Sequence, residues 1–184
     1  RGITACAALN SGNYLRFVAE FPHLKIQRRG NPAMLDQTDI RLLALLQRNA
    51  QLTAQELGDE LALSPSQAGR RRQRLETDGY ITAYRAVVSP EKIGLGVEAF
   101  IQVVMATHTA ENARDLLRVT RTQPEITAAW TLTGEADYLL RVFCADLSAL
   151  NRLVQQVLLP HPAVSRVQSQ IVMERVKPDA PLPL

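Results

Sequence analysis

The hydrophobic pattern of the chain changes its period once, near residue 90. From Asp36 to about Thr77, apolar residues recur every three or four positions, which is typical of amphipathic helices. After Val97, runs that alternate apolar and polar residues follow one another between helical stretches. The stretch 89–96 lies between the two patterns and holds one proline and two glycines, which indicates a linker. The pattern therefore predicts a small helical domain followed by an α+β domain.

The first half contains start signals for three short helices. Asp36 or Thr38 can cap the first helix, which should run to about residue 49 and turn its leucines inward. Thr53 opens the second with a Thr-x-x-Glu capping box, and Ser64 opens the third with a Ser-x-x-Gln box and a following proline. The short connection at residues 62–63 makes the last two helices a helix-turn-helix, with the first helix as its support.

The third predicted helix, residues 65–77, carries four arginines within five positions. At about 100° per residue, one face gathers Ser66, Gln67, Arg70 and Arg74, whereas Ala68 and Leu75 lie on another. A short capped helix with a guanidinium-rich polar face has the residue types that read base edges in the major groove of DNA. A solvated charged helix is the alternative, but the preceding helix-turn-helix pattern favours DNA reading.

The second half alternates strands and helices after a β-like segment at 79–84, which is expected to act as a wing or as the strand leaving the helical domain. The expected order is strand, helix, strand, strand, helix, strand, at residues 97–106, 111–122, 126–132, 138–144, 147–159 and 164–176. This βαββαβ order predicts a ferredoxin-like fold, with both helices on one face of an antiparallel sheet. The first strand is apolar on both faces, so the open face of the sheet is expected to pack against another subunit.

The basic balance of the chain is confined to its first residues. The net charge is +3, yet residues 1–33 alone hold five basic residues and one acidic residue. Residues 34–85 are neutral overall, and residues 86–184 carry a net charge of −1. The case for DNA binding must therefore rest on the placement of the arginines and not on the overall charge.

The expected organisation has five parts. Residues 1–33 show no sustained period and precede Met34, so they are interpreted as an N-terminal extension outside the natural fold, with a basic DNA-binding arm as the alternative. The other parts are a winged-helix-like helix-turn-helix domain at 34–88, a linker at 89–96, a ferredoxin-like domain at 97–176 and a proline-rich tail at 177–184.

Several classes of function have little support in the sequence. Cys6 and Cys144 form no Cys-x-x-Cys pair, which suits a reducing compartment, and no run approaches the length of a membrane span. His23, His108 and His161 have no metal-ligating neighbours at the usual spacing and accompany no nucleophile motif. The protein is therefore expected to be cytoplasmic and not an enzyme, with no catalytic residue, metal or cofactor.

Two sets of motifs resemble a known family. Leu35-Asp36-x-x-Asp39, Leu63-Ser64-x-Ser66, Arg74-Leu75-Glu76 and Gly79-x-Ile81 resemble the DNA-binding half of the bacterial and archaeal Lrp/AsnC regulators, the feast/famine proteins. Thr133-Gly134-Glu135-x-Asp137 and Ile171-Val172-Met173-Glu174 look like the matching C-terminal half. The resemblance covers the chain from about Met34 to its C-terminus, and both halves occur in the order of the family.

The resemblance implies a transcription regulator that responds to a small amino acid and binds double-stranded DNA as dimers, which commonly assemble into octamers. The third helix would enter the major groove and present Ser64, Ser66, Gln67, Arg70, Arg71 and Arg74. The effector would lie beside the turn between the second and third strands, where neighbouring dimers meet. Its site would comprise Thr131, Leu132, Thr133, Gly134, Glu135 and Asp137, with Val167 and Ser169 of the last strand.

The chemistry of the turn suits an amino acid, because free N–H groups near Gly134 can hold a carboxylate and Asp137 can pair with an ammonium group. The alternative is that Gly134 and Asp137 only close a hairpin.

Three positions depart from the family pattern. Arg72 replaces an apolar residue and must stack, extend to solvent or pair with a carboxylate such as Glu76. Gly69 lies inside the third helix, at a cost of about 0.5–1 kcal/mol relative to alanine. Val167 replaces a polar residue, which favours a smaller or more apolar effector. A ligand-binding oligomeric module and an architectural DNA binder without an effector remain the alternative functions.

Overall fold

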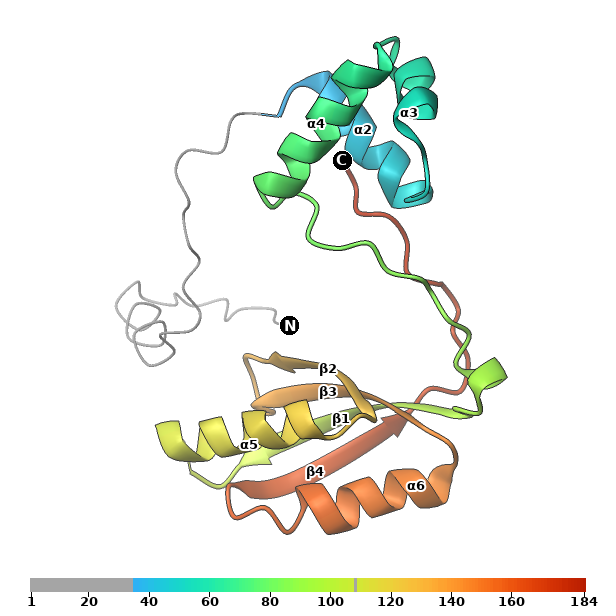
Figure 1. The fold of residues 1–184 in the computed structure, drawn as a ribbon. Helices are drawn as coiled ribbons and strands as arrows, with labels where there is room; N and C mark the ends of the chain where they lie inside the picture. The colour runs from blue at the N-terminus through green and yellow to red at the C-terminus, as the bar shows by residue number, and fades with distance from the viewer. Residues whose placement is uncertain (1–34, 108) are drawn as a thin grey trace, which may run out of the picture. The chain divides into compact units, whose positions relative to one another are not determined.

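The computed structural model describes residues 35–107 and 109–184, which form two compact units (Figure 1). The described residues up to Ala86, together with Asp179–Leu184, make up a helical unit, and Val87–Pro178 make up an α+β unit. The expected N-terminal extension, residues 1–33, and His108 lie outside the described residues. No helix in the described part of the chain is long and apolar enough to cross a membrane.

Three helices form the helical unit: α2 (Gln37–Arg48), α3 (Ala54–Leu61) and α4 (Pro65–Thr77). Their predicted caps are confirmed, because Asp36, Thr53 and Ser64 each accept a hydrogen bond from the backbone N–H three residues later. In each case the side chain three residues later accepts in return from the backbone of the capping residue, which completes a capping box. The helices bury a small apolar core, formed by Leu42, Leu43, Leu46, Leu57, Leu61, Ala68 and Leu75. The predicted helix-turn-helix is therefore present.

The turn between α3 and α4 depends on two small residues. Ala62 ends α3 in the left-handed region, with φ of 55°. Gly58 faces the turn so closely that a Cβ atom there would lie 2.7 Å from the carbonyl oxygen of Leu63. The backbone N–H of Leu63 donates back to the carbonyl of Gly58 over 2.9 Å. This close approach fixes the direction in which α4 leaves the turn.

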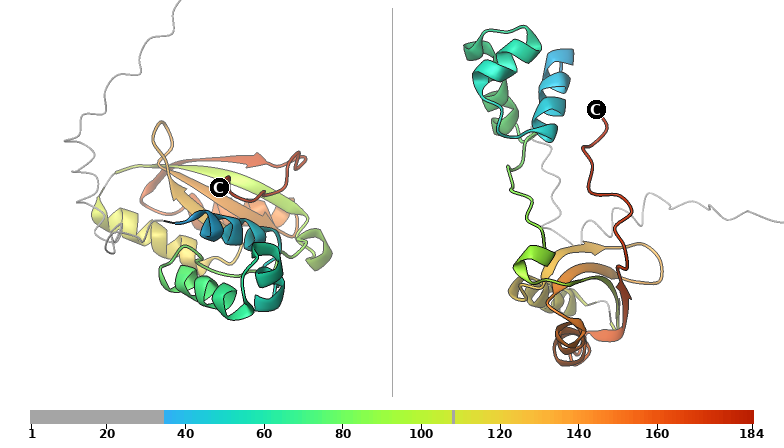
Figure 2. Two further views of the ribbon diagram at one scale, coloured as in Figure 1. Left: turned by 90° about the horizontal axis from the view of Figure 1, so that it is seen from above. Right: turned by 90° about the vertical axis from the view of Figure 1, so that its right-hand side faces the viewer.

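The α+β unit is an antiparallel sheet with two helices on one face (Figures 1 and 2). A short 3₁₀ helix, Glu91–Ile93, precedes it. Its elements are β1 (Val97–Met105), α5 (Ala110–Thr122), β2 (Ile126–Thr131), β3 (Tyr138–Cys144), α6 (Leu147–Arg152) and β4 (Val164–Ile171). The strands lie in the order β2-β3-β1-β4, which is the ferredoxin-like order, so the fold predicted from the pattern is confirmed.

The two faces of the sheet differ in burial. Alternate residues of β1 and β3, such as Ile101 and Leu140, are fully buried and pack with Leu116 of α5 and Leu150 of α6. The intervening residues lie on the opposite, open face and are only half-buried or exposed. The apolar ones are Phe100, Val104, Leu139 and Phe143, and Trp130 of β2 lies beside Leu139 on the same face. The open face of the first strand is thus mixed and not apolar throughout as the sequence indicated, because Glu98 and Gln102 alternate with Phe100 and Val104 there.

Two predicted strands end differently in the structure. Segment 79–84 forms no strand, because the N–H groups of Tyr80 and Ile81 both bond to the carbonyl of Leu75 and so close the end of α4. The last strand ends at Ile171 and not at residue 176. The N–H of Val172 still donates to the carbonyl of Glu98, but β1 begins one residue before Glu98 and offers no further partner.

The second helix of the α+β unit also differs from the prediction. It was expected to continue to about residue 159, but α6 ends at Arg152 and the chain continues as a π-helix, Leu153–Leu158. The wider helix still buries Leu153 and Leu158 against the sheet. Hydrophobic spacing alone does not distinguish the two kinds of helix here.

The C-terminal tail belongs to the helical unit. The side-chain amide of Gln47, near the end of α2, accepts from the backbone N–H of Leu182 at 2.6 Å and donates to its carbonyl at 3.3 Å. The chain therefore passes between the two units twice, once after Ala86 and once after Pro178.

Candidate functional site

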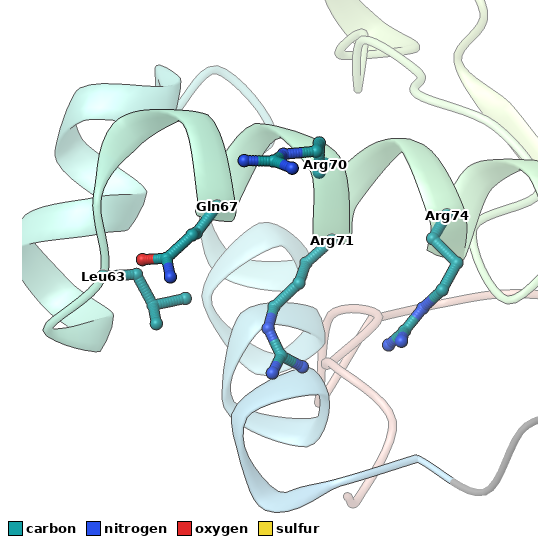
Figure 3. Close-up of a pocket in the computed structure, with 5 residues that line it drawn as sticks. All are labelled: Leu63, Gln67, Arg70, Arg71 and Arg74. Atoms are coloured by element: carbon teal, nitrogen blue, oxygen red, sulfur yellow. The ribbon is translucent and has the colours of Figure 1, made fainter.

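Helix α4 presents a polar hollow of about 340 Å³ on one side (Figure 3). Its lining consists of Leu63, Gln67, Arg70, Arg71 and Arg74. The capping box at Ser64 starts the helix, and Ala68 and Leu75 anchor its opposite side in the core. The sequence therefore leaves one face of α4 polar and accessible, and four of the six residues predicted to contact DNA line its hollow.

Two of these arginines are held by carboxylates at the start of α2. Arg71 donates to Asp36 at 2.6 Å and to Asp39 at 2.8 Å, and Arg74 donates to the second oxygen of Asp39 at 2.5 Å. Figure 3 shows both guanidinium groups turned to the same side of α4. Asp39 is almost completely buried, with 2% of its side chain exposed, so its charge requires these partners.

Charge pairing shifts the pKa values in this network. The hydrogen bond from Arg71, followed by the one from the Asp39 backbone, lowers the pKa of Asp36, and the two aspartates raise the pKa of Arg71. Both groups therefore stay ionised at neutral pH. The network locks α4 onto α2 and fixes the direction of its exposed face.

The remaining predicted contacts lie on the accessible side of α4. Arg70 donates only to the carbonyl of Ser66 in the preceding turn, at 3.3 Å, and pairs with no carboxylate among the described residues. Gln67 is engaged in the cap, and the hydroxyls of Ser64 and Ser66 lie 3.2 Å apart. Arg70 is thus the arginine of this face with a guanidinium available for an external anion.

Arg72 points away from this face and binds three neighbours. It donates to Glu76 at 3.1 Å, to the Tyr84 hydroxyl at 3.0 Å and to the carbonyl of Leu52 at 3.0 Å. Its guanidinium also stacks on the Tyr84 ring, 4.8 Å from the ring centre. The expectation that Arg72 would stack or pair with Glu76 is confirmed.

The turn between β2 and β3 is closed by Asp137. Its carboxylate accepts from the backbone N–H of Met105 at 2.7 Å, its own N–H donates to Val103, and its carbonyl accepts from Leu132. Gly134 has φ of 119°, which strongly favours glycine. Asp137 therefore ties the turn to the end of β1.

The two groups of residues expected to form the effector site lie apart within one chain. Thr131 pairs with Tyr138, and Leu132, Thr133, Gly134 and Glu135 continue into the exposed turn. Val167 and Ser169 lie on β4, opposite Val103 and Ile101, and β1 separates β4 from β3. A single chain does not bring the two groups into one pocket.

The sequence did not predict the roles of two residues that organise the site. Asp36 was expected only as a cap, and Asp39 only as part of a motif, whereas they hold Arg71 and Arg74. The sequence does place two acidic residues three positions apart at the start of a helix in the same small domain as an arginine run. That combination is the signal from which an ion-pair network could have been predicted.

A helix-turn-helix with an accessible arginine-bearing third helix, joined to a ferredoxin-like domain, defines a two-domain DNA-binding regulator. Comparison with known families agrees in both halves. Residues 35–82 match the winged helix-turn-helix DNA-binding family model, and residues 98–182 match the Lrp/AsnC ligand binding domain. The chain belongs to the Lrp/AsnC family of transcriptional regulators.

Individual relatives cover most of the chain. It is 36% identical over 151 residues to the DNA-binding transcriptional activator DecR of Escherichia coli K12, which spans 82% of this chain and 99% of DecR. It is 34% identical over 150 residues to the glutamate uptake regulatory protein of Zymomonas mobilis, or 82% of this chain and 91% of that protein. A Neisseria meningitidis transcriptional regulator solved in complex with L-Met superposes with a TM-score of 0.78 at 40% identity, over 81% of this chain and 96% of that one.

Proposed function

We propose that this regulator reads operator DNA with the accessible face of α4. Arg70 and Gln67 would contact base edges, and Ser64 and Ser66 at the start of the helix would contact phosphates. Arg71 and Arg74 would act mainly by holding α4 on α2, with their outer N–H groups near the DNA backbone. The observation that carries this assignment is the division of the three arginines on this face of α4: Asp39 holds Arg71 and Arg74, and Arg70 pairs with no carboxylate in the described part of the chain.

The C-terminal domain would bind a small amino acid or a related metabolite. The exposed turn at 133–135 would supply backbone N–H groups for a carboxylate and Glu135 for an ammonium group. Asp137 is already engaged with Met105, so Glu135 is the better partner for the ammonium group. Because β1 separates the turn from Val167 and Ser169, a second subunit would have to complete the pocket.

Dimers would form through the open face of the sheet and associate further, as far as octamers. The face carries Phe100, Val104, Leu139, Phe143 and the half-exposed Trp130 around the paired Glu98 and Arg141, and apolar side chains gathered on an open sheet face favour association. Association at the turns would then couple effector binding to the assembly state. We propose that this assembly is a soluble protein of the cytoplasm.

Affinity for selected DNA tests the DNA-reading face. Duplexes would be selected from a random library with the wild-type protein, and their affinity measured against salt for wild type and Arg70→Ala. Loss of a base contact should cost about 1–3 kcal/mol and relax the preference at one base pair. Loss of a phosphate contact would instead reduce, by about one, the slope of the logarithm of DNA affinity against the logarithm of salt concentration. Unchanged affinity and unchanged slope would remove Arg70 from the interface.

A thermal-shift screen of the twenty amino acids tests the ligand site. We expect one or a few small amino acids to raise the melting temperature, and Glu135→Gln to abolish that shift without changing apo-state melting. An architectural DNA binder without an effector would show no shift with any amino acid. A full shift in the variant would remove Glu135 from the pocket.

A further inference from the structure

Arg72, Glu76 and Tyr84 form a compact cluster on the side of α4 away from the candidate DNA face. Tyr84 donates its hydroxyl hydrogen to Glu76 at 2.7 Å, Arg72 binds both residues, and the guanidinium covers the tyrosine ring. The side chains of Arg72 and Glu76 are 28% and 38% exposed, so water does not fully screen these contacts.

Tyr84 lies in the connector that leads from α4 to the α+β unit, so the cluster holds part of this connector against α4. Helix α4 ends at Thr77, the chain is bonded back to Leu75 only as far as Ile81, and the connector to β1 follows. Tyr84 lies three residues into that connector and is attached to α4 by its side chain alone. Arg72 extends the attachment to the α2–α3 connection, because it also donates to the carbonyl of Leu52.

We propose that Arg72, Glu76 and Tyr84 form a latch that fixes the first part of the interdomain connector on the DNA-reading unit and so limits the half-site separations that the assembled regulator accepts. The inference rests on the proposed function, because it requires two helical units of one assembly to bind DNA together. The latch residues act on geometry and do not touch DNA themselves.

The expected effect follows from the reach of an extended chain. Releasing the three residues from Thr82 to Tyr84 lengthens each free connector by up to about 10 Å. Successive base pairs lie about 3.4 Å apart along the duplex axis. An unlatched protein should therefore accept half-sites moved by several base pairs, whereas the latched protein should not.

The protonation states favour the latch near neutral pH. Burial, together with the hydrogen bond to Glu76, raises the pKa of Tyr84, so its hydroxyl remains a donor. The hydrogen bond from Tyr84, followed by that from Arg72, lowers the pKa of Glu76, which remains an ionised acceptor.

Tryptic cleavage after Arg85, the residue that follows Tyr84, reports directly on the latch in the full-length protein. Arg72→Leu removes the bridging guanidinium, and Tyr84→Phe is a milder variant that removes only the hydroxyl. Both should be cleaved at Arg85 several-fold faster than wild type, because a protease needs a locally free segment. Arg72→Lys should give an intermediate rate, since lysine keeps the charge but not the forked geometry.

The matched control is Arg114→Leu, which removes an arginine from the exposed surface of α5 and should be cleaved at the wild-type rate. Equal cleavage at Arg85 in wild type, Arg72→Leu and Tyr84→Phe, with melting temperatures unchanged, would overturn the latch.

The second measurement is DNA affinity as a function of half-site spacing. A duplex selected by the wild-type protein would be altered by inserting one, two or five base pairs between its half-sites. Wild type should lose affinity about tenfold or more with two inserted pairs, and the latch variants should lose clearly less. A wild-type spacing profile in a variant that is cleaved faster would overturn the spacing claim. If wild type selects no duplex, the proposed function fails and the spacing claim fails with it, while the cleavage result still decides whether the latch exists.

Discussion

Asp39 lies between α2 and α4 with 2% of its side chain exposed, and its two oxygens accept from Arg71 and Arg74. A buried carboxylate without partners is strongly unfavourable, so the arginines are required by the fold before they can serve DNA. Arg70 pairs with no carboxylate among the described residues. Arg71 and Arg74 therefore stabilise the fold, whereas Arg70 is the arginine that we propose contacts DNA.

Replacing Asp39 tests its structural role. Asp39→Ala should lower the free energy of unfolding by roughly 2 to 4 kcal/mol, because two guanidinium groups lose their buried acceptor, and partial exposure of the arginines softens the loss. Asp59→Ala, which removes an exposed carboxylate on α3, is the control and should cost less than about 0.5 kcal/mol. Urea unfolding followed by circular dichroism gives both values, and equal stability of the two variants would contradict this role.

The lowered pKa of Glu98 makes the stability of the α+β unit depend on pH. Burial opposes ionisation of Glu98, but hydrogen bonds from Arg175 and Arg141, both at 2.7 Å, hold its pKa below the ordinary value of 4.5. Such a carboxylate stabilises the fold above its unfolded-state pKa, and this stabilisation is lost as pH falls through the lower folded value. The melting temperature should therefore decline below about pH 4.5.

The variant Glu98→Gln isolates that contribution. Its melting temperature should be lower than that of wild type at pH 7, and the difference should shrink as pH falls toward 3, since wild type is then losing the same charge. Calorimetry across this pH range is the measurement. A constant difference at every pH would show that Glu98 acts by packing alone.

At the scale of elements, alanine substitutions at two glycines of the helical unit should change stability in opposite directions. Gly69 lies inside α4, and a Cβ atom there would meet only the Ala54 Cβ, at an ordinary contact distance of 3.8 Å. Gly69→Ala should therefore stabilise the protein by about 0.5–1 kcal/mol, because alanine restricts the unfolded chain and favours the helix. Gly58→Ala should destabilise it by roughly 1–3 kcal/mol, because its Cβ would collide with the Leu63 carbonyl. Thermal melting of both variants checks the pair, and a stabilising Gly58→Ala would contradict the observed turn.

The local signals in the sequence were sufficient for most element starts. Asp36, Thr53 and Ser64 all cap helices as predicted, since a cap depends on residues only three positions apart. Element ends were less predictable. The last strand stops where β1 runs out of partners, and that limit belongs to the pairing and not to the apolar pattern of the strand itself.

The candidate site could be predicted only where it depends on local spacing along the chain. Helical spacing alone placed Arg70 and Gln67 on one face of α4. The ion pairs of Arg71 and Arg74 join residues more than thirty positions apart, and no local period reports them. The contact of Asp137 with Met105 likewise depends on how β1 lies beside the turn, so the sequence left its role open between ligand binding and turn closure.

At the scale of the whole molecule, the open face of the sheet predicts the assembly state. Phe100→Lys places a charge among the apolar residues of this face, and the proposed dimer should dissociate because burying a charged lysine in the interface is strongly unfavourable. Arg114→Glu, on the exposed surface of α5, is the control and should keep the native mass. Light scattering after size-exclusion chromatography gives the masses. An unchanged mass for Phe100→Lys, with normal circular dichroism, would place the interface elsewhere.

If amino-acid binding and DNA binding are coupled in one molecule, as we propose, each ligand must change the affinity for the other, and titrations of both ligands measure this. The amino acid found by thermal shift would be titrated with and without the selected duplex, and the duplex with and without the amino acid. We expect the amino acid to change DNA affinity by some factor, commonly about 5–150-fold, and DNA to change amino-acid affinity by the same factor. Tight DNA binding that no amino acid alters would show that the two sites are not coupled.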